Sequence, residues 1–139
     1  MGLGNRRDSM SDESITEDSL QKLVETFYGK VREDPLIGPV FNGAIEDWPA
    51  HLEKLQAFWS SVMLTTGRYK GQPMPAHVRH ADAISPASFE RWLAIWRETT
   101  EELLDPGAAA AMQDKAARIA ESLSLGIDFY RDRAAPPSR

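Results

Sequence analysis

Cysteine is the residue type that this sequence lacks altogether: none occurs among its 139 residues. Without cysteine the chain can form no disulfide, thiolate nucleophile, cysteine-ligated zinc site or iron–sulfur cluster. The three histidines are therefore the only side chains that could bind a soft or borderline metal at neutral pH. The positions of these histidines decide what kind of metal site the chain can build.

Long apolar runs and an excess of positive charge are also missing. No apolar run approaches the roughly 18–20 residues that a membrane span needs. The N-terminal sequence MGLGNRRDSMSDESI has no apolar segment like that of a signal peptide. The chain has 16 Lys and Arg against 21 Asp and Glu, and its net charge of −5 disfavours nucleic acid and anionic lipid as partners. We therefore expect a cytoplasmic protein that binds neither nucleic acid nor membranes.

The composition that remains is typical of one globular domain. Apolar residues make up 42% of the chain, including five Phe, four Trp and three Tyr, which is enough for one core. Residues 1–14 are rich in Gly, Ser and charge, and residues 132–139 are rich in Arg and Pro. We predict a mobile tail at each end and a single domain over residues 15–131.

Four segments space their apolar residues as helices do. They run from about Thr16 to Arg32, from Asp47 to Thr66, from Ser85 to Leu103, and from Asp105 to Arg131. The last three open with a capping residue closely followed by proline, which is typical of a helix start. No segment alternates as a strand would, so the chain is predicted to be all-α.

The connections between these helices are unequal in length. Pro35 and the pair Gly38-Pro39 predict the end of the first helix and a short irregular stretch that contains Phe41. Between the second and third helices lie the 18 residues from Gly67 to Ile84, interrupted by glycines and prolines. So long an irregular segment in a compact domain often has a function, and this one contains two of the three histidines, His77 and His80.

Polar atoms interrupt three of the apolar helix faces. Tyr28, His51 and Trp92 each place a polar group among large apolar side chains, and a buried Tyr or Trp normally needs a partner for that group. A histidine from the long connection could approach the same place from the opposite side. A flat apolar cofactor with an axial metal position would suit this arrangement, and haem meets that description.

Five sequence blocks carry a resemblance to a known family. They are LVETFYGKV around Phe27-Tyr28, GPVFN around Phe41, WPAHLEKLQAFW from Trp48 to Trp59, YKGQPMPAH ending at His77, and FERWLAIW from Phe89 to Trp96. In order and spacing, over about residues 16–131, the chain resembles a group III truncated haemoglobin. The resemblance implies a truncated globin fold, a two-over-two helical sandwich around a haem, with the F helix reduced to a short turn.

The resemblance also implies roles for particular residues. His77 would bind the iron of haem b through Nε2, while an acceptor at its other ring nitrogen fixes the tautomer. Tyr28 and Trp92 would donate hydrogen bonds to an iron-bound ligand, and His51 would stand at the gate between pocket and solvent. Phe41 would pack against the haem plane, Leu55 would line the distal helix with His51, and Phe58 would also contact the haem.

Three further residues leave alternatives open. His80, three residues after His77, is a rival iron ligand, although the motif favours His77. Lys54 could reach a haem propionate, but its position favours a solvated surface lysine. Arg79 has the same two interpretations.

The predicted function is the binding of oxygen, nitric oxide or carbon monoxide at a histidine-ligated haem iron. The same pocket suits nitric oxide dioxygenation or peroxidase-type turnover, so the choice between enzyme and oxygen carrier or sensor stays open. No flavin or nicotinamide motif occurs, so a catalyst would need an external reductase. The protein is expected to be a monomer or a weak dimer.

Two hypotheses from other classes compete with this prediction. The chain could be a haem-free helical module that binds a protein or small regulator in an aromatic cleft. It could also hold a mononuclear metal through His77, His80 and nearby carboxylates, although two histidines without cysteine make a small ligand set.

Overall fold

All regular structure in the described residues is helical. The computed structural model describes residues 15–71, 73, 77 and 84–134, with side chains as far as residue 129. The helices are α2 (Glu17–Glu33), α3 (Gly38–Ala44), α4 (Trp48–Leu64), α6 (Pro86–Leu103) and α7 (Pro106–Ala134). No strand occurs in these residues, so the all-α prediction is confirmed. Helix α7 continues three residues past the predicted domain end, and the expected tails at residues 1–14 and 135–139 lie outside the described residues.

The helix starts use the capping residues that the sequence indicates. In each case the cap side chain accepts a hydrogen bond from a backbone N–H three residues on, which satisfies one of the otherwise unpaired donors of the first turn. These bonds join Thr16 to Ser19 at 3.1 Å, Asp47 to Ala50 at 3.1 Å, Ser85 to Ser88 at 3.3 Å and Asp105 to Ala108 at 2.8 Å. Local sequence therefore fixes where all four long helices begin.

The short helix α3 corrects one expectation. Phe41 was predicted to lie in an irregular stretch, but it belongs to a helix of two turns. Pro39 occupies the first turn, where its missing N–H costs nothing. The buried carboxylate of Asp34 accepts the N–H groups of Leu36 and Ile37, both at 3.0 Å. This turn redirects the chain at once into a new helix, so Pro39 lies at a helix start and not in an irregular stretch.

Helix α3 comes unusually close to the end of α2 at Gly38. A Cβ atom on this residue would lie 2.8 Å from the carbonyl oxygen of Arg32 and 3.1 Å from that of Val31. Both neighbours are rigid backbone atoms, so no side chain fits there without displacing one of the helices.

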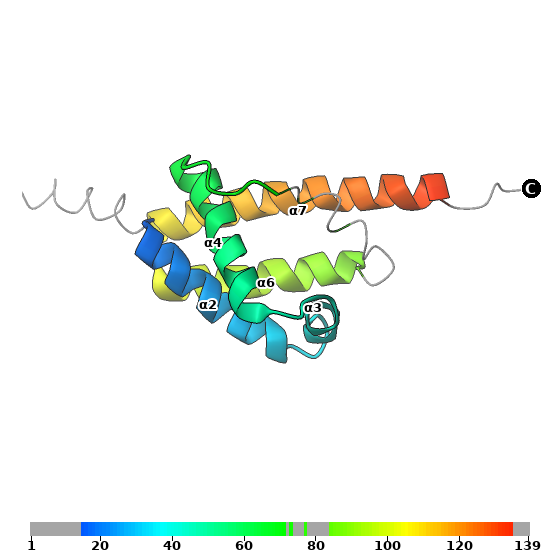
Figure 1. Cartoon of the computed structure of the whole chain (residues 1–139), viewed down its shortest axis with the longest axis horizontal. Coiled ribbons are helices and arrows are strands. Elements are labelled where there is room, and N and C mark those ends of the chain that lie inside the picture. The colour runs from blue at the N-terminus through cyan, green and yellow to red at the C-terminus, as the bar shows by residue number, and fades with distance from the viewer. Residues whose placement is uncertain (1–14, 72, 74–76, 78–83, 135–139) are drawn as a thin grey trace, which may run out of the picture.

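The helices pack as two pairs, α2 with α4 and α6 with α7, and one pair lies across the other (Figure 1). Helices α6 and α7 lie side by side and run in opposite directions, while α2 contacts α3, α4 and α6. Helix α2 therefore links α4 to the α6–α7 pair, and α4 also meets α6 directly where Trp59 stacks on Trp96. None of the helices in the described ranges is long and apolar enough to cross a membrane.

The core lies where these helices meet and is rich in aromatic side chains. Phe27, Trp59 and Trp96 come from α2, α4 and α6, and each is at most 2% exposed. The ring of Phe27 stands edge-on to Trp96 with 4.7 Å between centroids. The indole N–H of Trp96 donates to the carbonyl oxygen of Met112 on α7 at 3.2 Å, so its polar group is satisfied within the core.

Candidate functional site

Tyr28 on α2 is buried beside Trp92 on α6. Its side chain is 4% exposed, and it forms a hydrogen bond with the side chain of Trp92. An indole N–H can only donate, so the tyrosine oxygen is the acceptor and keeps its own O–H for another partner. Burial raises the pKa of Tyr28 to about 12, against the opposing effect of the bond from Trp92. The hydroxyl is therefore protonated, and a hydrogen-bond donor, at every physiological pH.

The two polar aromatics are held in place by the rings around them. Phe27 lies edge-on to Tyr28 at 4.6 Å and to Trp92 at 5.3 Å between centroids. Phe41 of α3 contacts Tyr28 at 5.7 Å, and Trp48 of α4 lies 6.0 Å away. The hydroxyl and the indole N–H are thus positioned by rigid rings on three helices.

His51 approaches the same place from α4. Its ring lies 6.4 Å from Tyr28 and 5.8 Å from Trp48, perpendicular or nearly so to each. Burial lowers the pKa of His51 most, and the positive charges of Lys54 and His77 lower it further. The neutral imidazole is therefore favoured. Because His77 acts on the pKa of His51, the two histidines lie within electrostatic range of each other.

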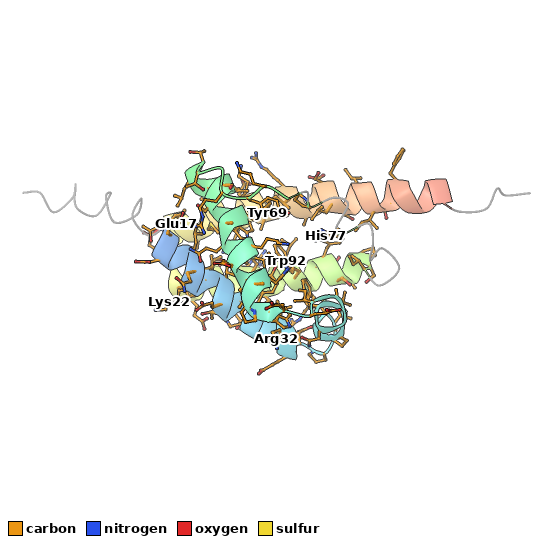
Figure 2. All side chains as sticks on the ribbon, viewed as in Figure 1. Glu17, Lys22, Arg32, Tyr69, His77 and Trp92 are labelled. Carbon is orange, nitrogen blue, oxygen red and sulfur yellow. The ribbon has the colours of Figure 1, made fainter. Side chains whose placement is uncertain are left out.

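His77 lies in the connection between α4 and α6, with its ring half-buried (Figure 2). Its Nδ1 is 2.7 Å from the carbonyl oxygen of Pro73, four residues earlier. A carbonyl can only accept, so in the neutral ring Nδ1 carries the proton and the lone pair is on Nε2. The structure thus provides an acceptor that fixes the tautomer needed for metal binding through Nε2.

The apolar face of α4 is less covered than its sequence suggests. Leu55 and Phe58 are only partly buried, and so are further apolar residues of the same helix, Leu52, Val62 and Met63. Lys54 is exposed, at the surface of the helix. Since buried apolar area stabilises a fold by about 25 cal/mol per Å², an incompletely covered wall favours an additional apolar group.

The structure brings most of the predicted site residues together. Ring contacts and a hydrogen bond connect Tyr28 to Trp92, Phe41 and His51, and His77 lies within electrostatic range of His51. Leu55 and Phe58 share α4 with His51. The two remaining candidates, Arg79 and the rival ligand His80, lie outside the described residues.

Two contributors to the site had no role in the sequence interpretation. Trp48 contacts both Tyr28 and His51. From the sequence, only its position in the first turn of a helix was predicted. Pro73 supplies the carbonyl that orients His77. The spacing of four residues in PMPAH is the signal that could have identified it, because residues four apart meet on a helical turn.

Metal sites of other kinds find no support in the described residues. No group of three or more His, Asp or Glu side chains gathers there in a way that could hold a metal ion. The hypothesis of a mononuclear metal held by His77 and His80 involves a residue outside that part of the chain.

Comparisons with known proteins agree with the resemblance in the sequence. No family model matches the chain. Group 3 truncated hemoglobin ctb of Campylobacter jejuni is 39% identical over 94 residues, which cover 65% of this chain and 73% of that protein. The crystal structure of the group III truncated hemoglobin from Campylobacter jejuni superposes with a TM-score of 0.73 and 31% identity, covering 89% of this chain and 98% of the other.

These similarities define first the class and then the family. The helical arrangement is that of a truncated globin, which confirms the predicted fold class. The chain belongs to the group III truncated haemoglobins.

Proposed function

We propose that the chain binds haem b with His77 as the axial iron ligand through Nε2. The observation that carries this proposal is the 2.7 Å contact between Nδ1 of His77 and the carbonyl oxygen of Pro73. It supports the tautomer whose Nε2 lone pair can bind iron, and it restricts rotation of the ring. Bound haem would supply an iron with one coordination position for a diatomic ligand.

The residues on both sides of the site suit a flat apolar macrocycle. The partly buried face of α4, with Leu55 and Phe58, would cover one surface of the porphyrin, and Phe41 would pack against its plane. Covering these side chains removes apolar surface from water, which favours binding. Lys54 is exposed on the same helix and could reach a propionate only at the edge of the site.

On the distal side, Tyr28 would donate a hydrogen bond to the diatomic ligand, and Trp92 would orient Tyr28, because its single N–H is already donated to the tyrosine oxygen. Oxygen bound to ferrous iron carries partial negative charge, so donors directed at it strengthen binding. Tyr28 keeps its O–H available because it accepts from Trp92, and the bond from Trp92 fixes where that O–H can point. Each hydrogen bond is worth about 0.5–1.5 kcal/mol, or roughly several-fold to tenfold in affinity.

His51 would act at the entrance to this pocket. It is half-buried, lies against Tyr28 and Trp48, and is favoured in its neutral form. A neutral imidazole can rotate outward without carrying a charge across an apolar wall, which suits a gate. Oxygen is the ligand we propose, with nitric oxide and carbon monoxide as alternatives. Turnover of nitric oxide or peroxide would require an external reductase or electron donor.

The test is a haem titration of the purified chain with matched variants. The wild-type chain should bind one haem and show the absorption of a histidine-ligated iron. His77→Gly should lose that spectrum and regain it when imidazole is added, because free imidazole can replace the missing ligand.

The rival ligand provides the control. His80→Gly should bind haem as the wild type does. If His80→Gly loses the spectrum and His77→Gly keeps it, the ligand assignment is wrong. If no chain binds haem stoichiometrically, the haem-free binding module becomes the better interpretation.

A further inference from the structure

A continuous stack of indole rings runs through the core from the candidate site. Trp92 and Trp96, four residues apart on α6, are nearly parallel, with 5.6 Å between centroids and 6° between planes. Trp96 stacks in turn on Trp59 of α4 at 4.8 Å and 19°. Three of the four tryptophans in the chain therefore form one column.

The column continues beyond Trp59 toward the surface. Phe58 stands edge-on to Trp59 at 5.4 Å, and Tyr69 stands edge-on to Phe58 at 5.2 Å. Tyr69 is half-buried, and its backbone N–H donates to Ser61 of α4 at 2.8 Å. Its ring also covers Gly71, where a Cβ would lie 2.6 Å from the tyrosine oxygen. Tyr69 is thus fixed at the outer end of the column (Figure 2).

Packing alone does not require this choice of side chains. Leucine or isoleucine fills a helical core without any polar atom, whereas each buried indole needs an acceptor, as Trp96 needs Met112. Indole and phenol are also the side chains in this chain that lose a single electron most readily. Electrons tunnel efficiently between aromatic rings in contact, so this column has a chemical property that an aliphatic core lacks.

We propose that the column Trp92–Trp96–Trp59, extended across Phe58 to Tyr69, conducts single electrons from the surface to the candidate site. Tyr69 would then be a second site, at which small phenols are oxidised. The proposal deepens the proposed function and rests on it for the oxidant, a hydroperoxide reduced at the haem site.

The overall reaction is balanced. One hydrogen peroxide takes up two electrons and two protons and becomes two molecules of water. Two phenol molecules each give up one electron and one proton and become phenoxyl radicals. Within the protein, Tyr69 loses one electron to the column and its proton to water, and a phenol then restores both.

Exposure decides which tyrosine can be the outer terminus. An oxidised tyrosine is strongly acidic and must release its phenolic proton. Tyr69 is half-buried and can release the proton to solvent, whereas Tyr28 is 4% exposed and lies at the inner end beside Trp92. The surface reaction is therefore assigned to Tyr69.

The test is freeze-quench electron paramagnetic resonance of the haem-loaded ferric chain after mixing with hydrogen peroxide. The wild type should form a tyrosyl radical that decays faster when guaiacol, a small phenol, is present. Tyr69→Phe should lose this radical and the guaiacol-dependent decay. It keeps the ring contact with Phe58, so folding should be unaffected. The control Tyr130→Phe should retain both signals.

A second measurement tests the column without haem. Azide radicals from pulse radiolysis oxidise indoles in the full chain carrying Tyr28→Phe and Tyr130→Phe, which leave Tyr69 as the sole tyrosine. The indolyl absorption should convert to that of a tyrosyl radical at a rate independent of protein concentration, and adding Trp59→Phe should slow the conversion.

The two measurements separate failure of the relay from failure of the proposed function. A chain that binds no haem but converts indolyl to tyrosyl radical contradicts the proposed function and supports the column. A tyrosyl signal unchanged in Tyr69→Phe, or a conversion rate unchanged by Trp59→Phe, overturns the relay.

Discussion

The two sides of the candidate site differ in how completely the protein itself packs them. On the α2–α6 side, Phe27 and Trp96 have no exposed surface, and Tyr28 is bonded to Trp92. On the α4 side, Leu55 and Phe58 are only partly buried. The difference indicates that the polypeptide by itself holds Tyr28 and Trp92 in place, whereas it leaves the apolar side chains of α4 partly uncovered.

The largest expected effect comes from breaking the packed side. Trp96→Ala removes a fully buried indole and leaves the Met112 carbonyl without its donor, so we expect a loss of about 3–5 kcal/mol in the free energy of unfolding. Leu55→Ala on the partly buried side should cost less than about 2 kcal/mol in the haem-free chain. Urea unfolding measures both. Equal costs would contradict the contrast between the two sides.

Added haem should increase the difference in stability between the two sides of the site. A ligand present at one hundred times its dissociation constant stabilises the folded state by about 2.7 kcal/mol, provided that it binds only that state. We therefore expect the thermal midpoint to rise with haem concentration, and the cost of Leu55→Ala to grow. His77→Ala is the matched control and should show a smaller rise. A thermal midpoint independent of haem would contradict the role assigned to the α4 face.

Acid should loosen the packed side at the junction of α2, α3 and α6. Burial raises the pKa of Asp34, but bonds from the Ile37 N–H, the Arg91 side chain and the Leu36 N–H outweigh burial, so the net pKa is lowered. Arg91 Nε lies 2.6 Å from the carboxylate. A lowered pKa in the folded state means that the unfolded chain binds more protons, so stability should fall as pH drops through and below the ordinary value of 3.8.

The matching substitution is Asp34→Asn, which should cost about 1–3 kcal/mol at neutral pH and flatten the acid dependence. Chemical unfolding across the acidic range measures both effects. Asp18→Asn, an exposed carboxylate in the first turn of α2, is the control and should leave the slope nearly unchanged. A slope in Asp34→Asn as steep as in the wild type would assign the acid sensitivity elsewhere.

The smallest expected effect is on ligand affinity. Tyr28→Phe removes one hydroxyl from the packed side, so oxygen affinity should fall roughly several-fold to tenfold, corresponding to about 0.5–1.5 kcal/mol. Oxygen dissociation measured by stopped flow should speed up accordingly. Tyr69→Phe removes the same group outside the pocket and should leave the dissociation rate unchanged. An unaltered rate in Tyr28→Phe would exclude its hydroxyl as a donor to bound oxygen.

Most of the fold could be predicted from the sequence because its signals are local. The caps at Thr16, Asp47, Ser85 and Asp105 lie beside the apolar periodicity that they introduce, so the four long helices were found nearly to the residue. Helix α3 was missed because its start depends on a buried carboxylate that also reaches Arg91 on a distant helix. A proline considered by local sequence alone indicates the end of a helix. Only the contacts of Asp34 with Ile37 and Arg91 distinguish a new helix from a loop at this point.

The candidate site was predictable in its residues but not in its geometry. Periodicity singled out Tyr28 and Trp92, and the family resemblance singled out His77. That Tyr28 accepts from Trp92, and that Pro73 orients His77, depends on side-chain directions that spacing does not encode. The column through Trp59 was not predictable for the same reason, since its members come from two helices that lie far apart in the sequence.

The close approach at Gly38 limits how this protein can be redesigned. The corner between α2 and α3 sets the position of Phe41, so any change in its length or angle would displace a wall of the candidate site. Exposed positions such as Gln21 or Lys22 can be altered for labelling or immobilisation at little cost. Residue 38 has no such tolerance: even alanine would force two backbones apart, and a library that varies this corner should hold glycine fixed.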